Sequence, residues 1–335
     1  MDKTIIIAEA GVNHNGDLSK ALKMIDAAVE AGADYVKFQT AVPELVISSI
    51  APKAEYQKET TGAGQSQLEM CRAIHLPLSD YTVIADACRE RGIGFMSTPF
   101  DLVSIDCLAK IGMDYWKIPS GEITNLPYLR KVARQRSRVI LSTGMSTLDE
   151  VRHAVRVLTD NGTPPSDIIL LHCTTQYPTP MQAVNLRAML ALGTLGCAAV
   201  GYSDHTIGIE VPVAAVAMGA KVIEKHFTLD KNLPGPDHRA SLSPDELRDM
   251  VTAIRNIELA LGSGIKQVAD AERDNIAVAR KSIVAARDIR KGEVFTEENI
   301  TVKRPGNGIS PMLWDEVIGR TATRDFAYDT LIVID

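Results

Sequence analysis

Between residues 4 and 262, short β-rich runs alternate with longer segments whose apolar residues recur at helical spacing. Eight β-rich runs can be counted, at 4–10, 35–40, 94–100, 114–120, 138–144, 168–175, 198–204 and 221–227. Such alternation predicts a parallel sheet covered by helices. Eight units of about thirty residues each fit a closed (β/α)₈ barrel better than an open doubly wound sheet. We therefore expect an α/β fold, with a TIM barrel over residues 1–262.

Capping signals at two helix starts support this pattern, and one long segment interrupts it. Thr147 with Glu150, and Ser243 with Glu246, have the spacing of a capping box. The segment 41–76 is too long for an ordinary connection between a strand and a helix. Loops of that length inside a compact domain are usually functional, so we expect this one to lie over the top of the barrel.

The composition changes after residue 262. Residues 263–279 are polar and indicate a partly helical linker. Residues 280–335 contain short β-rich runs, with turn signals at Lys291–Gly292 and Pro305–Gly306. We expect a second, small and mostly β domain over 280–335.

Charge and composition argue against several classes of partner. The chain has 335 residues and a net charge of −6, and it contains no block rich in Lys and Arg, which argues against nucleic acid or an anionic membrane as a partner. The apolar run before Glu9 is too short for a signal peptide or a membrane span, so a cytoplasmic location is expected. The five cysteines show no C-x-x-C spacing, which argues against a disulfide framework or a zinc knuckle.

The predicted strands end in polar residues, and barrel enzymes build their active sites at the carboxyl ends of the strands. In chain order these residues are Glu9, Lys37 with Gln39, Ser97 with Thr98, Lys117 with Ser120 and Glu122, Ser142 with Thr143, His172 with Thr174, Thr175, Gln176 and Tyr177, Ser203 with Asp204 and His205, and Glu224 with Lys225 and His226. Polar groups are costly to bury without partners. Their concentration at one end of the strands predicts a polar, charged pocket there.

Two histidines close adjacent strands of the predicted barrel. His205 follows the seventh strand and His226 ends the eighth, so both imidazoles should reach the same rim. A pair of neutral imidazoles with open coordination positions suits a divalent metal such as Mn²⁺, Zn²⁺ or Co²⁺. The alternative is a pair of hydrogen-bonded histidines in a polar pocket, and the spacing alone leaves both open.

Lysines and carboxylates suggest the chemistry of the pocket. Lys37 and Lys117 lie inside apolar strands, where lysine is rarely structural. With hydroxyls such as Thr98 nearby they could neutralise a phosphate or a carboxylate, or one lysine could form a Schiff base. Glu9 and Glu122 are candidates for general acid–base work or for binding sugar hydroxyls, and the alternative is ion pairing with the lysines.

The assembled motifs resemble the sialic acid synthase family. They are "IIIAEAGVNHNGD", "GADYVKFQT", "STPFD", "WKIPSGEITNLPYL", "ILSTGM", "LHCTTQYPTP", "GYSDHT", "IEKHFTLDKNLPGPDHRASL" and "KRPGNGIS", in order along the whole chain. The segment after the barrel resembles the antifreeze-like (SAF) domain that these enzymes carry. The resemblance implies a condensation of phosphoenolpyruvate with an N-acetylated mannosamine-type sugar and water, which gives a nine-carbon 2-keto acid and phosphate with C–O cleavage.

The resemblance also assigns roles to residues. His205 and His226 match positions that hold a divalent metal, Mn²⁺ or Mg²⁺, which polarises the sugar aldehyde. Positions that hold phosphoenolpyruvate are matched by Lys37, Thr98, Lys117, Ser120 and Ser203. Gln39 is also expected to bind substrate. Positions that contact the amino sugar are matched by Glu122, Tyr177 and Asp237, and Glu9 matches a carboxylate near the reacting carbons. Some members have Asn where this chain has Thr175, so Thr175 is a weaker phosphate ligand candidate.

Two further implications concern the partner subunit and the sugar. Arg304 matches an arginine that the SAF domain lends to the active site of the partner subunit, which implies a domain-swapped homodimer. "CTTxYP", "YQKETTGAGQSQLEM" and "GPDH" resemble enzymes that make N,N′-diacetyllegionaminate at least as well as those that make N-acetylneuraminate. The sugar, N-acetylmannosamine or 2,4-diacetamido-2,4,6-trideoxymannose, therefore stays open.

Three rival functions make different demands on the sequence. A phosphoenolpyruvate-dependent synthase of the deoxyoctulosonate type, acting on a sugar phosphate, would need a second phosphate site rich in Arg, which the strand ends do not offer. A Schiff-base nonulosonate aldolase would be independent of metal and would be trapped by borohydride. A non-enzymatic sugar-binding or ice-binding protein would have no use for paired lysines and histidines at strand ends.

Overall fold

The computed structural model describes residues 3–61, 64 and 66–334 of the chain. The chain divides into two compact units, Met1–Gly262 and Ser263–Asp335. Each unit has its own hydrophobic core.

The first unit is a barrel of eight parallel strands. These are β1 (Ile5–Gly11), β2 (Tyr35–Thr40), β3 (Gly94–Pro99), β4 (Tyr115–Ile118), β5 (Arg138–Ser142), β6 (Ile168–His172), β7 (Ala199–Asp204) and β8 (Val222–His226). They are hydrogen-bonded in the order β3-β2-β1-β8-β7-β6-β5-β4, and β3 packs against β4. The eight strands lie within three residues of their predicted bounds, so the prediction of a TIM barrel is confirmed.

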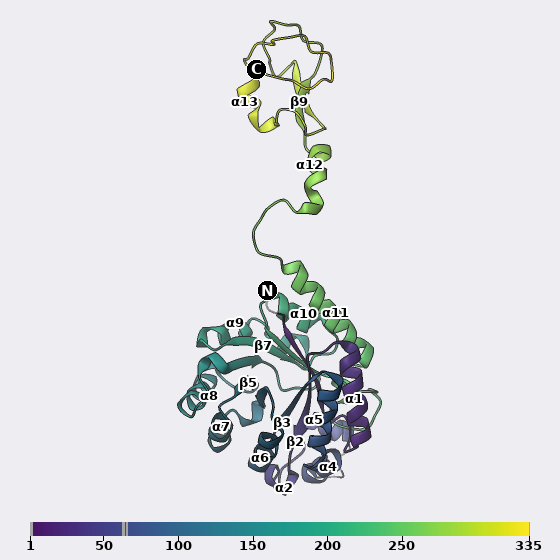
Figure 1. The fold of residues 1–335 in the computed structure, drawn as a ribbon, viewed down its shortest axis with the longest axis vertical. Coiled ribbons are helices and arrows are strands. Elements are labelled where there is room, and N and C mark those ends of the chain that lie inside the picture. Colours follow the sequence, from purple (N-terminus) through teal and green to yellow (C-terminus); the bar gives the residue numbers. More distant parts are fainter. Residues whose placement is uncertain (1–2, 62–63, 65, 335) are drawn as a thin grey trace. The chain divides into compact units, whose positions relative to one another are not determined.

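Helices surround the sheet (Figure 1). They are α1 (Leu18–Ala31), α5 (Asp80–Arg91), α6 (Leu102–Ile111), α7 (Leu126–Ala133), α8 (Leu148–Asp160), α9 (Ala188–Leu192), α10 (Glu210–Ala217) and α11 (Pro244–Leu261). Both predicted capping boxes are confirmed: Thr147 begins α8 and Ser243 begins α11, each paired with the glutamate three residues later. Each box satisfies backbone N–H groups that the first helical turn would leave unpaired.

The segment 41–76 was predicted as one long loop, but it contains three short helices. They are α2 (Pro43–Val46), α3 (Glu55–Thr61) and α4 (Gln67–Ile74). Ser66 and Glu69 form a capping box at the start of α4, and Met70 is buried. The cap and the buried Met70 side chain account for order in a segment whose length alone predicted a loop. As part of the connection after β2, these helices lie at the carboxyl end of the barrel, the lower end in Figure 1.

The second unit is small and has an antiparallel pair of strands. The strand β9 (Ser282–Ala285) pairs with β10 (Ile300–Lys303), and isolated bridges such as Ile289 to Phe326 extend the β structure. Within this unit, α12 (Arg273–Ala279) precedes β9, and α13 (Trp314–Val317) follows β10. The predicted small β-containing domain is therefore confirmed. In the described parts of both units, no helix has the length and apolarity that a membrane crossing requires.

Candidate active site

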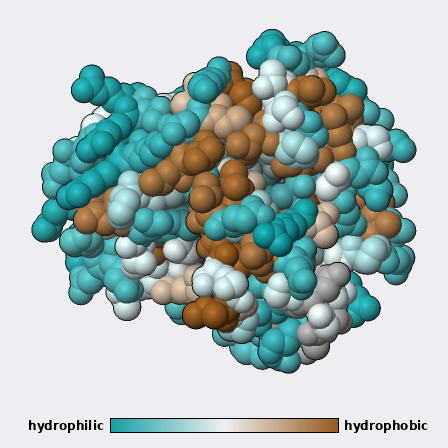
Figure 2. Space-filling model, turned by 90° about the horizontal axis from the view of Figure 1, so that it is seen from below, coloured by the Kyte–Doolittle hydropathy of each residue, from teal (hydrophilic) through white to brown (hydrophobic). Residues whose placement is uncertain are grey.

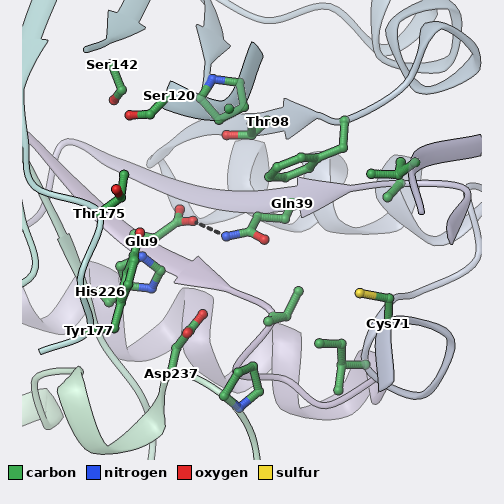
Figure 3. Close-up of a pocket in the computed structure, with 18 of the residues that line it drawn as sticks. Glu9, Gln39, Cys71, Thr98, Ser120, Ser142, Thr175, Tyr177, His226 and Asp237 are labelled. Atoms are coloured by element: carbon green, nitrogen blue, oxygen red, sulfur yellow. Dashed lines mark hydrogen bonds between the residues drawn. The ribbon is translucent and has the colours of Figure 1, made fainter. Parts of the chain in front are cut away.

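A cavity of about 370 Å³ opens among the carboxyl ends of the barrel strands (Figure 3). Of the predicted site residues, those that line it are Glu9, Lys37, Gln39, Thr98, Lys117, Ser120, Thr175, Tyr177, Ser203, His205, His226 and Asp237. They come from seven of the eight strands or from the loops that follow, so the barrel brings together residues more than 200 positions apart in the chain. Figure 2 looks onto this end of the barrel.

Two of the residues to which the resemblance assigns a role do not line the cavity. Glu122 follows β4 and is half-buried, and it accepts a hydrogen bond from Asn125 Nδ2 at 2.6 Å. Burial raises the pKa of its carboxyl group. Arg304 lies in the second unit, where it is exposed and donates from Nε to the carbonyl of Ala279 at 3.1 Å.

The two lysines are buried inside the cavity wall, each 3% exposed. Lys37 Nζ donates to Thr98 Oγ1 at 3.0 Å, and Lys117 Nζ donates to Ser142 Oγ at 2.7 Å. Each ammonium group therefore has a hydroxyl partner as well as carboxylates near it. Two ammonium groups with interleaved hydroxyls form a site for an anion with several oxygens, such as a phosphate or a carboxylate.

Two buried carboxylates balance the lysines. Glu9 Oε2 lies 2.8 Å from Lys37 Nζ, and Glu9 Oε1 accepts a hydrogen bond from Gln39 at 3.0 Å. Glu224 lies 3.7 Å from Lys37 Nζ and 3.5 Å from Lys117 Nζ. Its Oε1 also accepts a hydrogen bond from Ser203 at 3.0 Å. The sequence places Glu224 and Ser142 at strand ends but indicates no role for them. Their contacts with Lys37 and Lys117 arise only when separate strands come together in the barrel.

Burial and the neighbouring charges separate the two carboxylates in acidity. Burial raises the pKa of Glu9, and the Lys37 ammonium only partly opposes it. Burial acts on Glu224 in the same direction, but Lys117 and Lys37 together outweigh it and lower the pKa of Glu224. Glu224 is therefore a fixed negative charge, whereas Glu9 can exchange a proton. Such a pair with pKa values pushed apart is typical of acid–base chemistry.

The two histidines face each other beside the carboxylates, with ring centroids 5.6 Å apart. His205 Nδ1 donates to the carbonyl of Thr174 at 2.6 Å, which leaves its Nε2 lone pair without a proton, and His226 Nδ1 is buried without a hydrogen-bond partner. Burial lowers the pKa of His205 to about 4 and the pKa of His226 well below its usual value, so both rings are neutral.

Neutral imidazoles with an available nitrogen are the ligand form that divalent transition metals bind. Within 3–61, 64 and 66–334, no cluster of three or more His, Cys, Asp or Glu side chains has a metal-binding arrangement. Two histidines alone leave most of a metal's coordination positions to water or substrate. The residues therefore fit a catalytic metal with open positions better than a closed structural one.

Behind the histidines, a buried ion pair fixes the ends of β7 and β8. The Lys225 ammonium contacts the Asp204 carboxylate and donates to the carbonyl of Thr206 at 2.7 Å. Asp204 also accepts hydrogen bonds from the backbone N–H and the hydroxyl of Thr206, at 3.1 and 2.9 Å. This network ties together the residues that flank His205 and His226.

Tyr177 and Asp237 form another part of the wall. The Tyr177 ring lies 4.1 Å from the His205 ring, between centroids, and is perpendicular to the His226 ring at 5.7 Å. Asp237 is buried, and burial together with the nearby Glu9 charge raises its pKa to about 7. Its neighbour His238 is held between Thr228, at 2.7 Å, and Asn15, at 3.2 Å. These contacts hold the loop that presents Asp237 to the cavity.

The cavity end near Thr175 is closely packed. Gly144 donates its backbone N–H to Ser120 Oγ at 3.0 Å. A Cβ atom on Gly144 would lie only 2.7 Å from Thr175 Cγ2 and 2.9 Å from Ser120 Oγ. Glycine is therefore needed here, because any side chain would clash with Ser120 and Thr175, which both line the cavity.

Comparisons with known proteins show the family of the chain. The NeuB family model matches residues 24–266, and the SAF domain model matches residues 280–335. The chain is 53% identical to an N,N′-diacetyllegionaminic acid synthase from Campylobacter jejuni, over 99% of each chain. It is 46% identical to an N,N′-diacetyllegionaminic acid synthase from Legionella pneumophila, over 98% of this chain and 93% of the relative.

A solved structure gives the same result. The N-acetylneuraminic acid synthetase of Leptospira borgpetersenii, in complex with citrate, superposes with a TM-score of 0.71 at 34% identity. The match covers 82% of this chain and 90% of the other. The chain is an enzyme of the synthase type: it belongs to the NeuB family and carries a C-terminal SAF domain.

Proposed function

We propose that this protein condenses phosphoenolpyruvate with an N-acetylated mannosamine-type sugar and water, to give a nine-carbon nonulosonic acid and phosphate. The names of its relatives support this class of reaction. The observation that carries the proposal is the juxtaposition of two buried lysines with hydroxyl partners and two neutral histidines in one cavity. The first pair suits a phosphorylated acid, and the second pair lies where the aldehyde of the sugar would react.

The lysine end of the cavity would hold phosphoenolpyruvate. Lys37 and Lys117 supply two positive charges, and Thr98, Ser120 and Ser142 supply hydroxyl groups that can donate to its phosphate or carboxylate oxygens. Among the described lining residues there is no arginine. A second phosphate on the sugar would therefore find no bidentate cation among these residues of its own subunit, which favours an unphosphorylated sugar.

In the reaction, C3 of phosphoenolpyruvate forms a bond to the aldehyde carbon of the sugar, and water adds at C2. Phosphate then leaves as the C2–O bond breaks, and it takes the proton of the new C2 hydroxyl group, which becomes the keto oxygen. The attacking water loses a proton, and the former aldehyde oxygen gains one. Glu9, whose pKa is raised by burial, is placed to accept or return a proton, and Gln39 orients its carboxyl group.

We propose His205 and His226 as ligands of a divalent metal of the Mn²⁺ or Mg²⁺ class. Such an ion, when bound, supplies Lewis-acid polarisation of the aldehyde oxygen. The chain's own contribution is to present two neutral imidazoles, one of which is fixed by the carbonyl of Thr174. Tyr177 packs against both rings and restricts their rotation.

We also propose a homodimer in which Arg304 of the SAF domain completes the cavity of the partner subunit. The proposal is supported by apolar side chains exposed on the loops that follow the barrel strands, including Met145 at 73%, Ile207 at 62% and Met181 at 52%. Figure 2 shows hydrophobic residues gathered around the middle of this face. A large apolar surface of this kind usually marks an interaction site.

The experiment is phosphate release from phosphoenolpyruvate with Mn²⁺, with N-acetylmannosamine and 2,4-diacetamido-2,4,6-trideoxymannose offered separately. Release that depends on a sugar and stops with EDTA is expected, and it should be absent in His226→Ala. Release that continues in the presence of EDTA would disprove the role of the metal, and trapping by borohydride would instead indicate a Schiff base at a lysine.

A second experiment tests the arginine from the partner subunit. Arg304→Ala should lower turnover without altering the unfolding temperature of the barrel. Full turnover by a chain ending at residue 270 would disprove the role of this arginine.

A further inference from the structure

The cavity has two chemically different ends. Lysines, carboxylates and histidines line the end at the strands. The other end is lined by Gln57, Gln67 and His75 and by a larger number of apolar residues, all from the segment 41–76. The apolar residues are Ala41, Pro43, Val46, Ile47, Met70, Cys71 and Ile74. In Figure 3, Gln39 lies between Glu9 on one side and Cys71 on the other, so Cys71 marks the end that is remote from the charges.

The apolar wall is held in place by its own contacts. The helices α2 and α4 pack together, and Arg72 Nε of α4 lies 2.6 Å from Glu44 Oε1 of α2. The carbonyl of Ile74 accepts a hydrogen bond from the backbone N–H of Gly16, at 3.1 Å, which ties α4 to the loop after β1. Met70 is only 3% exposed, so its buried side chain helps to hold α4 in place. The wall is therefore a preformed surface that is attached to the barrel.

If the proposed function holds, the position of the sugar follows from the order of the groups. Phosphoenolpyruvate takes the lysine end, and the aldehyde carbon of the sugar must lie beside its C3 and near the histidines. The remaining carbons of the open-chain sugar then extend away from the lysines. The space left for them is the end of the cavity that α2 and α4 enclose.

Resting on that function, we propose that the apolar end is a subsite for C4 to C6 of the sugar. It selects a sugar with a C6 methyl group and a second acylamino group at C4 over the hydroxylated N-acetylmannosamine. A methyl group gains by leaving water for the surface formed by Ile47, Met70 and Ile74. A hydroxyl group at the same place would lose its hydrogen bonds to water and find no replacement on these three side chains.

The subsite also contains a group that suits a second amide. Gln67 lines the same end of the cavity, and its carboxamide can both donate to and accept from an acylamino group. A sugar with a hydroxyl in place of the methyl group would not match the apolar surface beside it. Ile47, Ile74 and Gln67 are thus specificity-determining residues, although they lie away from the reacting carbons.

The test compares Ile47→Asn with a matched control, Ile50→Asn. Both isoleucines lie in the segment after α2, but Ile47 lines the cavity, whereas Ile50 is 89% exposed and does not. For each protein, kcat/KM is measured with N-acetylmannosamine and with 2,4-diacetamido-2,4,6-trideoxymannose, and the KM for phosphoenolpyruvate is measured with each sugar. Thermal unfolding shows whether each variant folds, and Ile74→Asn repeats the test on α4.

We expect the wild-type protein to prefer the trideoxy sugar, by about a hundredfold in kcat/KM. Ile47→Asn and Ile74→Asn should each lower kcat/KM for that sugar about tenfold or more, and leave N-acetylmannosamine within about threefold. The KM for phosphoenolpyruvate should stay unchanged, and Ile50→Asn should behave as the wild type.

The outcomes separate two kinds of failure. If the wild type releases phosphate with neither sugar, the proposed function is wrong. If it is active but prefers N-acetylmannosamine, the subsite proposal is overturned while the function stands. Equal losses with both sugars in the folded variants would also overturn the subsite proposal. A wild-type preference for N-acetylmannosamine overturns the subsite proposal even if no variant folds.

Discussion

Two groups of buried charge lie on opposite faces of the same pair of strands. In the register of β7 and β8, Ser203 is opposite Glu224 and Asp204 is opposite Lys225. Because successive side chains of a strand point to opposite faces, Glu224 enters the cavity and Lys225 lies on the other side. Both are almost inaccessible to solvent, at 4% and 1%. Burial alone therefore does not distinguish the two groups.

The hydrogen bonds do distinguish them. Around Lys225, both Asp204 oxygens accept hydrogen bonds, and the lysine also donates to a backbone carbonyl. In the cavity, the Oε2 atoms of Glu9 and Glu224 accept no hydrogen bond of normal geometry, although lysines lie near them. A complete network is typical of structure, and an incomplete one leaves capacity for a ligand. The comparison indicates that the cavity cluster serves function and the other pair serves stability.

The largest expected effect is that of Lys37→Met. The substitution removes a cation that contacts both Glu9 and Glu224, so kcat/KM should fall about a thousandfold. The free energy of unfolding should change by less than about 2 kcal/mol, because Glu9, whose pKa is raised by burial, can take up a proton. Steady-state kinetics and urea unfolding measure the two quantities. A variant that unfolds readily but keeps wild-type kcat/KM would reverse the assignment of this cluster.

The opposite result is expected for Lys225→Met. Removing one partner of a complete buried pair leaves the Asp204 charge unpaired, which should cost about 3–5 kcal/mol in the free energy of unfolding. The folded fraction should keep kcat/KM within about threefold of the wild type.

The double variant Asp204→Asn with Lys225→Met is the control for this pair. It removes both charges, so it should recover part of the lost stability. The comparison breaks down if Lys225→Met is as stable as the wild type, or if it loses activity as completely as Lys37→Met.

Much of this organisation follows from the sequence. The alternation of β-rich and helical segments was sufficient to predict eight strands close to their observed bounds, since each strand carries apolar residues that must be buried. Barrel geometry then collected Lys37, Lys117, His205 and His226 at one end without any knowledge of side-chain contacts.

The remainder depends on contacts that no single segment reveals. The charge balance at Glu224 requires two lysines from β2 and β4, which only the closed barrel brings near β8. The apolar wall of α2 and α4 could not be predicted because short helices are stabilised by packing more than by local propensity. The close approach of Gly144 to Ser120 and Thr175 is likewise a tertiary feature, since a glycine in a loop indicates a turn as readily as a close contact.

The smallest expected effects are those of removing one hydroxyl group beside each of the two buried carboxylates, Glu224 and Asp204. Ser203 Oγ donates to Glu224, and Thr206 Oγ1 donates to Asp204, at 3.0 and 2.9 Å. Each deletion should cost about 1 kcal/mol where its hydrogen bond matters. Ser203→Ala should therefore lower kcat/KM about tenfold, because the charge on Glu224 becomes less fixed within the cavity.

For Thr206→Val, the loss should instead be seen in the free energy of unfolding, by about 1 kcal/mol, with kcat/KM unchanged. Both substitutions remove one hydroxyl from a buried carboxylate on the same strand pair, so they differ mainly in the face of the sheet that they affect. If both variants lose stability equally and neither loses activity, the unpaired oxygens of the cavity are not a sign of function. If only Ser203→Ala loses activity, the cavity side of the sheet, where the carboxylate oxygens lack hydrogen bonds, is the side that serves function.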